Sequence, residues 1–345
     1  PGFPVGCVNS FAAFTHADTC TITDERPVSA NLTIPAQGGS YVDPQFGNTV
    51  KRVTGAGQNI QYGALSAFSA TGKYLLTSST TTGQVDVYTQ AGAVAYASVP
   101  GANINFSAWD PNDDERLWYM DNATIKYRQL NTGTVVTAAD YSTSSGTRPG
   151  MIAITMGGTV DITDDGWWAF RDPTNFSTLC AVNLNGLTTA TQESKTFCAD
   201  ISSLNLTDLD FTQITQVDSE THKRYVLAVA APTGHVYSVG ATGLNYEYPI
   251  PTGPEDITAE PHSDVGQDSK GRQIFFWQWY SPADNRYFLA AVQLNKGSDM
   301  TRPVEEGGGL SYLYLSDGGN FTTDDLHVDE CLSVRVSSWF RGHFL

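Results

Sequence analysis

At 345 residues the chain is long enough for one large all-β domain or two ordinary ones. Only 16% of its residues are charged, while 16 Tyr, 16 Phe and 7 Trp supply apolar area, which excludes an intrinsically disordered chain. The net charge is −17 without any Lys/Arg cluster, so we expect no nucleic-acid partner, and no apolar run has the length of a membrane span.

The first 30 residues lack the repeated pattern that follows them. We predict an N-terminal extension over residues 1–30, in which Cys7 and Cys20 close a short loop, and a β-propeller over residues 31–345. The chain begins at Pro1 without a charged and apolar leader, and we therefore expect that a signal peptide has been removed. The protein is predicted to be secreted and extracellular.

Cysteines and sequons agree with an oxidising compartment. Besides Cys7 and Cys20, the pair Cys180 and Cys198 lies close in sequence, Cys331 is left over, and no CxxC motif suggests a metal. The spacing favours two disulfides, and the alternative is a set of buried thiols. The candidate glycosylation sites are Asn31, Asn105, Asn122, Asn175, Asn205 and Asn320.

One unit recurs along the chain: a polar turn, an aromatic and β-branched strand, a second turn, and an alternating strand. The five copies span residues 68–88, 109–128, 162–184, 216–239 and 267–292. Their turn positions are Gly72, Asp114, Gly166, Thr221 and Gly271, at a period near 50 residues. Such a period with two hairpins per repeat is typical of propeller blades, which stack radially because one sheet cannot bury both of its faces.

The remaining segments are predicted to complete a ring. Residues 43–54 and 326–339 are predicted to form strands, and we expect the N- and C-terminal strands to pair in one shared blade. The fold class is therefore all-β, a single β-propeller of seven blades, with six as the alternative count. A two-sheet sandwich or a β-helix would explain the strands but not the period.

Residues 42–54, followed by the turn phrase at 68–75, resemble the opening of the oligogalacturonate-lyase-like propellers and of their TolB-like relatives. Ala70 and Thr71 stand where that family usually has Pro-Asp. Residues 260–272 are similar to a later family phrase in which a His precedes a turn. The turn phrase also occurs in non-enzymatic propellers, so the resemblance supports the fold prediction more than it supports an activity.

The resemblance implies a metal site. In those lyases imidazoles and an amide from different blades hold a divalent metal, which neutralises the uronate carboxylate and stabilises the charge that develops there. Here His262 lies just before the fifth copy of the repeat, and His327 lies at the start of the segment 326–339. Asp264 and Asp329 follow them at i+2, on the same face of a strand. These four residues are the candidate ligands for one divalent cation, Mn, Zn or Ca. The alternative is that they are ordinary strand-edge residues.

For the base that removes the proton, such propellers use Arg or Tyr. Arg148, in an inter-blade loop, and Arg171, after an aromatic strand, are the candidate catalytic residues. The alternative for both is a surface guanidinium. The sequence also lacks a tight His and Gln cluster near its C-terminus, which the lyases carry.

Two further features are interpreted as structural. The acidic run at 110–115 lacks the spaced ligands of a calcium loop, and we interpret it as a solvated turn. Trp167 and Trp168 are adjacent on a predicted strand, so they point to opposite faces and at least one of them packs between blades.

The sequence does not decide whether the protein is an enzyme. The favoured hypothesis is a secreted propeller that binds a carbohydrate or an extracellular protein. The alternatives are a metal-assisted polysaccharide lyase acting by β-elimination on a uronate-containing glycan, and a self-assembling extracellular structural protein.

Overall fold

In the computed structural model of the protein, the described secondary structure is almost entirely β. The described residues are 33, 35–42, 49–60, 66–99, 107–121, 123–142, 162–171, 177–204, 211–229, 234–250, 263–267, 270–281, 286–295, 310–314 and 335–336. Helical structure within them is short and includes α1 (Gln192–Lys195) and the 3-10 turn η2 (Ser202–Leu204). Every strand pairing in these ranges is antiparallel, which confirms the all-β prediction.

The first three sheets follow the chain in order. They comprise β1 (Ser40–Val42) and β2 (Thr49–Lys51); then β3 (Gln58–Ile60), β4 (Tyr74–Ser79), β5 (Val85–Thr89) and β6 (Val94–Tyr96); then β7 (Ser107–Asp110), β8 (Asp113–Asp121), β9 (Thr124–Gln129) and β10 (Thr134–Asp140).

Three more sheets complete the described part of the chain. They comprise β11 (Trp167–Arg171), β12 (Thr178–Asn183) and β13 (Thr196–Asp200); then β14 (Phe211–Val217), β15 (Arg224–Val229), β16 (Gly234–Val239) and β17 (Leu244–Ile250); then β18 (Ser263–Gln267), β19 (Gln273–Ser281), β20 (Arg286–Gln293) and β21 (Leu310–Tyr314), with β22 (Arg335–Val336) beside β18.

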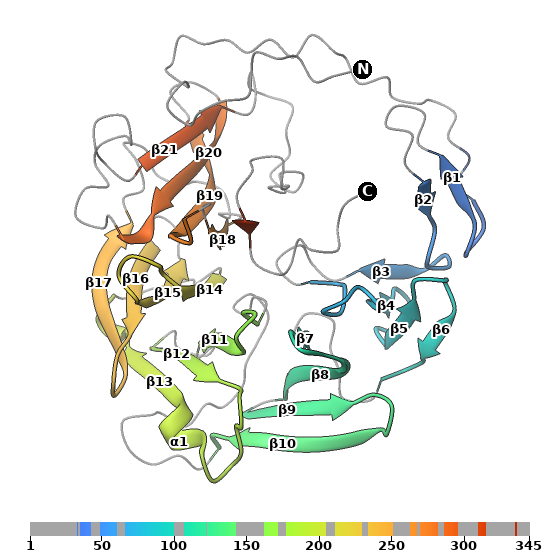
Figure 1. Ribbon diagram of the computed structural model, residues 1–345, viewed down its shortest axis with the longest axis horizontal. Coiled ribbons are helices and arrows are strands. Elements are labelled where there is room, and N and C mark those ends of the chain that lie inside the picture. Colours follow the sequence, from blue (N-terminus) through green and yellow to red (C-terminus); the bar gives the residue numbers. More distant parts are fainter. Residues whose placement is uncertain are drawn as a thin grey trace.

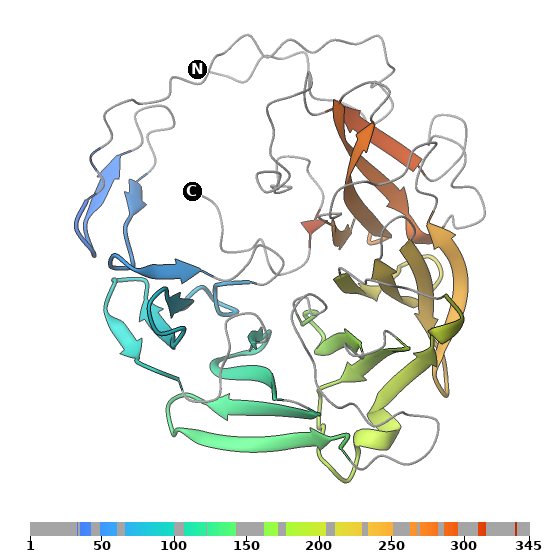
Figure 2. The same cartoon turned by 180° about the vertical axis from the view of Figure 1, so that it is seen from behind.

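The sheets are arranged as the blades of a propeller. Figure 1 shows them following one another around a central axis, with β7, β11, β14 and β18 nearest the centre and β10, β13, β17 and β21 at the rim. The view from behind shows the same radial order (Figure 2). From β3 to β21, the strands of each sheet pair in chain order, and β22 is added beside β18, so these sheets are simple meanders.

The two end regions pair with other partners in the described residues. Thr49–Lys51 pairs with Ser40–Val42, and Arg335–Val336 pairs with β18 at Gly266 and Gln267. The predicted pairing of residues 49–54 with residues 326–339 is not among the described strand pairings. Ring closure and the number of seven blades therefore stay predictions.

The hydrophobic core lies between the blades. One cluster joins the β7–β10 and β11–β13 blades and contains Trp168, which is fully buried; the next joins the β11–β13 and β14–β17 blades and has Trp167 at its margin. Trp167 packs against Phe197 at 5.6 Å between ring centroids. The two tryptophans thus point to opposite faces, as predicted, and both serve packing.

The recurrent turns have a common backbone reason. Gly72, Gly166 and Gly271 adopt φ values of 73°, 81° and 79°, a region that other residues rarely enter. These glycines lie in the turns that lead into β4, β11 and β19, which is why the repeat is visible in the sequence.

Those same turns bond each blade to the next. The backbone N–H of Thr71 donates to Asp114 at 2.9 Å, and the N–H of Gln273 donates to the buried Asp218 at 2.8 Å. Arg224 forms an ion pair with Asp165 of the preceding blade. The carboxylates therefore satisfy donors of a neighbouring blade.

The interpretation of residues 110–115 as a solvated turn is wrong. Asp110 is buried and accepts a hydrogen bond from Trp118 Nε1 at 2.9 Å, Asp114 binds Thr71, and Glu115 binds the β3–β6 blade. A single sequence does not reveal this role because the partners lie about 40 residues away.

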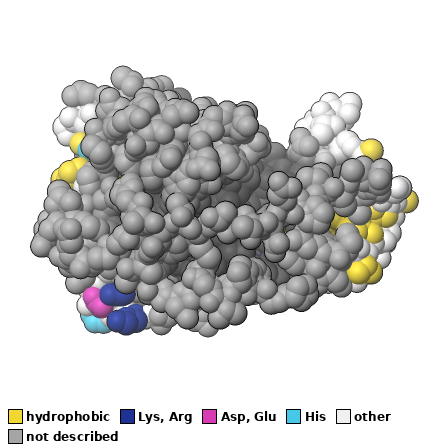
Figure 3. All heavy atoms as spheres, turned by 90° about the horizontal axis from the view of Figure 1, so that it is seen from above, with side chains coloured by type: hydrophobic (Ala, Val, Ile, Leu, Met, Phe, Trp, Pro, Cys, Tyr) yellow, Lys and Arg dark blue, Asp and Glu magenta, His cyan; other side chains and the backbone are white. Residues whose placement is uncertain are grey.

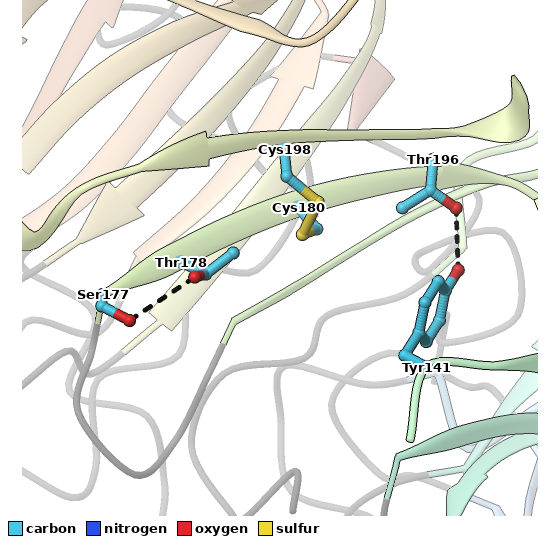
Figure 4. The surroundings of a disulfide bond; sticks show 6 residues. All are labelled: Tyr141, Ser177, Thr178, Cys180, Thr196 and Cys198. Atoms are coloured by element: carbon cyan, nitrogen blue, oxygen red, sulfur yellow. Dashed lines mark hydrogen bonds between the residues drawn. A yellow bond between two sulfur atoms is a disulfide. The ribbon is translucent and has the colours of Figure 1, made fainter. Parts of the chain in front are cut away.

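The predicted disulfide between Cys180 and Cys198 is present. The two residues are directly opposite each other on β12 and β13, with Cα atoms 4.1 Å apart (Figure 4). In the same view the hydroxyls of Tyr141, which follows β10, and of Thr196 on β13 are 2.8 Å apart and join two blades. Covalent and hydrogen bonds thus hold β13, the outermost strand of its blade, on both sides. Cys7 and Cys20 lie outside the described residues.

The described outer surface carries a few exposed apolar side chains. In Figure 3 the hydrophobic side chains gather mainly on the side where β1 and β2 lie in Figure 1, and Val42 on β1 is 62% exposed. Val135 on β10, at 46% exposure, is a second example. Single valines of this kind are ordinary for outer strands.

Candidate functional site

A groove of about 660 Å³ opens at the rim between the β11–β13 and β14–β17 blades. Its two walls come from outer strands of neighbouring blades, so neither blade could form it alone. Its described lining residues are Cys198, Ala199, Asp200, Ser203, Leu204, Tyr237, Leu244 and Tyr246. The volume falls in the range of roughly 300–1,000 Å³ that is typical of ligand sites.

The first wall is the end of β13 together with η2. The N–H of Ser202 donates to Asp200 Oδ1 at 2.9 Å, an Asx turn that leads from the strand into η2. Hydrogen bonds from the Ser202 hydroxyl and N–H lower the pKa of Asp200 below its ordinary value. Asp200 is exposed and carries a full negative charge at neutral pH.

The second wall depends on a β-bulge. The register between β16 and β17 shifts at Glu247, so that Tyr246 and Tyr248 point to opposite faces although they are two residues apart. The Tyr248 hydroxyl donates to the carbonyl of Leu294 in the next blade at 2.5 Å. Tyr246 instead lies opposite Tyr237 and faces the groove.

The two groove tyrosines form an edge-to-face pair. Their ring centroids are 5.3 Å apart with 70° between the planes, a favourable aromatic geometry. Tyr237 is only 4% exposed, and burial, with smaller contributions from Tyr246 and Asp200, raises its pKa to about 12. Tyr246 is 50% exposed. The buried ring therefore supports a ring that is half open to solvent.

His235 lies next to this pair. Its ring centroid is 6.1 Å from that of Tyr246, and burial lowers its pKa, so the imidazole is neutral at pH 7. Its Nδ1 is buried and has no hydrogen-bond partner among the described residues. His235 adds no charge to the groove.

Gly243 brings the two walls together. A Cβ atom at this position would stand 2.9 Å from the carbonyl oxygen of Cys198. The start of β17 can approach β13 closely because this residue has no side chain.

The candidate metal ligands are not brought together in the described part of the chain. His262, His327 and Asp329 lie outside it, and Asp264 is described only by its backbone, on β18 opposite Phe276. Within the described ranges no group of three or more His, Cys, Asp or Glu residues could hold a metal ion. The metal site stays a prediction.

Of the two candidate bases, only Arg171 is described. It ends β11, opposite Leu179, and its side chain is 4% exposed, so the alternative of a surface guanidinium is wrong for it. Arg148 lies outside the described residues, as do the six candidate glycosylation sites, Asn31, Asn105, Asn122, Asn175, Asn205 and Asn320.

Sequence reasoning missed the groove. His235 and Tyr237 alternate on a strand, which indicates a shared face, but Tyr246 and Tyr248 have the same spacing and the bulge separates them. The Asp-x-Ser phrase at Asp200 is a recognisable turn signal. Only the neighbouring blade makes it part of a site.

Comparisons with known proteins find similar architectures and no sequence family. No family model matches the chain, and no curated protein matches it. Among solved structures, a streptogramin B lyase is 12% identical with a TM-score of 0.37, covering 74% of this chain and 84% of that one. A putative 6-phosphogluconolactonase from Bacteroides fragilis is 12% identical with a TM-score of 0.43, covering 78% and 74%. An oligogalacturonate lyase from Vibrio parahaemolyticus is 10% identical with a TM-score of 0.34, covering 80% and 84%.

The described helices do not approach a membrane span. Because α1 has four residues, no helix in the described ranges reaches the length that a bilayer requires.

Proposed function

We propose that this protein is a secreted β-propeller that binds a carbohydrate in the groove between the β11–β13 and β14–β17 blades. The observation that carries the proposal is the half-exposed ring of Tyr246, supported from behind by the buried Tyr237. The face of a pyranose ring presents C–H groups of slight positive charge, which pack on the electron-rich face of an aromatic ring.

The polar part of the groove suits the same ligand. Asp200 and Ser203 stand on the wall opposite the tyrosines and offer acceptors for sugar hydroxyls. A purely apolar groove would favour a hydrophobic peptide, whereas one aromatic platform with polar groups across from it favours a sugar.

Calorimetric titration of the protein with a panel of oligosaccharides tests this function. We expect Tyr246→Ala to weaken binding of the responding glycan about tenfold, since the stacking surface is removed. Val135→Ala, an exposed outer-strand position on another blade, is the control and keeps the full affinity. Equal affinity of Tyr246→Ala and the unmodified protein, or binding of peptides alone, contradicts the proposal.

Secretion is part of the proposal. The disulfide between Cys180 and Cys198 supports it, because such bonds persist in oxidising compartments. Mass spectrometry of the protein from its own source is expected to find glycans on some of the predicted asparagines and a second disulfide between Cys7 and Cys20. Two unmodified thiols at these cysteines would count against the N-terminal clip.

For the ring we propose seven blades, closed by pairing of the N- and C-terminal strands within residues 31–345. An open ring would leave a blade face in water, and closing a long loop costs only logarithmically more than closing a short one. A chain that begins at Gly55 should therefore melt at a clearly lower temperature. An unchanged melting temperature would refute this closure.

The second candidate function is metal-assisted β-elimination on a uronate-containing glycan. The observation in its favour is the burial of Arg171 at the end of β11, since a guanidinium in a site of low dielectric attracts a carboxylate strongly. Incubation with pectate and ulvan in the presence of Mn, Zn or Ca tests it by the absorbance of the unsaturated product. Absence of that product with every metal would remove the lyase function.

A further inference from the structure

The charge in the groove comes from one residue. Asp200 is the only charged side chain among the described lining residues, and neither Lys nor Arg occurs in that set. His235, which lies beside Tyr246, is neutral. The groove thus presents a negative charge with no cation among its described lining residues, in a protein whose net charge is −17.

The turn at Ser202 holds the Asp200 carboxylate in place, and the negative charge of this carboxylate acts on Tyr237. The N–H of Ser202 fixes the Asp200 carboxylate at 2.9 Å, so the side chain is oriented by its own turn. Its negative charge contributes to the raised pKa of Tyr237 on the opposite wall. A ligand stacked on Tyr246 would lie within the field of this carboxylate.

We propose that Asp200 is the specificity-determining residue of the groove and makes it select uncharged sugars over uronic acids. This inference rests on the proposed carbohydrate binding at the same site. A carboxylate accepts strong, charge-assisted hydrogen bonds from the hydroxyls of a neutral sugar. The same carboxylate repels a second carboxylate at C6 of a uronate, and no described lining residue offers a compensating cation.

The test compares pairs of oligosaccharides that differ only in oxidation at C6. The probes are hexamers of β-1,4-glucose, β-1,4-galactose and β-1,4-mannose, each with its fully C6-oxidised counterpart, titrated calorimetrically against the full chain. We expect the neutral member of the responding pair to bind about fivefold more tightly at low salt. The ratio should fall as ionic strength rises, because screening weakens the repulsion.

Asp200→Asn is the decisive variant, since it removes the charge and keeps the shape. The ratio should fall close to one, mainly through tighter binding of the uronate. The matched control is Asp140→Asn, because Asp140 is also a strand-end residue held by a serine two positions on, Ser142, whose N–H donates at 3.0 Å. This control should leave the ratio unchanged.

The outcomes separate the two proposals. Equal binding of both members by the unmodified protein, or a ratio that Asp200→Asn leaves unchanged, overturns the role of Asp200 while binding in the groove stands. Binding of none of the six probes counts against both. Tighter binding of a uronate by the unmodified protein would also overturn this inference and would favour the lyase candidate.

Discussion

Two junctions between blades carry the same aromatic arrangement and use it differently. Tyr74 and Tyr96 of the β3–β6 blade meet edge to face at 5.8 Å and 65°, and Tyr237 and Tyr246 of the β14–β17 blade meet at 5.3 Å and 70°. At the first junction the Glu115 carboxylate, from the next blade, accepts hydrogen bonds from both hydroxyls at 2.8 Å and from Lys73 at 2.7 Å. That junction is closed.

At the second junction the neighbouring carboxylate belongs to Asp200. It accepts its hydrogen bonds from the turn that follows it in the chain, and not from the tyrosines. Its bonds go to Ser202, and the hydroxyls of Tyr237 and Tyr246 have no hydrogen-bond partner within the described ranges. The comparison teaches that the tyrosine pair does not by itself make a site. The bonding of the nearby carboxylate decides whether the two blades seal or leave a groove.

The largest effect is expected from the disulfide behind the groove wall. Replacing Cys180 and Cys198 by Ala should lower the free energy of unfolding by about 3 kcal/mol, because the bond closes a loop with a sequence separation of 18. Urea denaturation measures the loss, and glycan titration should show weaker binding because β13 forms one wall. A variant with unchanged unfolding would mean that Tyr141 and the strand pairing alone hold β13.

Opening the closed junction should cost less. Glu115→Ala leaves the hydroxyls of Tyr74 and Tyr96 without their acceptor, and we expect a loss of about 2 kcal/mol in the free energy of unfolding. Glu115→Gln keeps the shape and one acceptor oxygen and should lose less. If both variants unfold like the parent in urea, the carboxylate does not seal this junction.

Removing one hydroxyl at each junction sharpens the comparison. Tyr96→Phe deletes a hydrogen bond to Glu115 and should cost about 1 kcal/mol in unfolding free energy. Tyr246→Phe deletes a hydroxyl that bonds to no described residue, so stability should stay the same within the error of denaturation curves. Equal losses for the two variants would erase the distinction between the junctions.

The smallest effect concerns acid. Burial alone would raise the pKa of Glu115, but the hydrogen bonds from Lys73, Tyr96 and Tyr74 outweigh it and leave the pKa below the ordinary value of 4.5. The unfolded chain therefore takes up this proton first as the pH falls, and the stabilisation is full above 4.5 and disappears below the folded pKa. The stability difference between the parent and Glu115→Gln should close over that interval, and a constant difference would contradict it.

Much of the architecture was readable from local sequence signals. Alternating aromatic and β-branched residues predict strands, and the glycines at Gly72, Gly166 and Gly271 mark turns because only glycine readily takes their backbone conformation. The spacing of Cys180 and Cys198 indicated a disulfide that is present. These signals depend on a residue and its near neighbours in the chain.

The groove was decided by contacts that no local pattern encodes. The bulge at Glu247 follows from the register between two strands, and it alone sends Tyr246 toward one blade and Tyr248 toward the other. The acidic run at 110–115 became an inter-blade joint because its donors stand on another blade. The sequence by itself determined the strands, the turns and the repeat, since backbone conformation and side-chain alternation are local properties. Only the tertiary structure decided which junction closes and which stays open, because that depends on pairing between residues of separate blades.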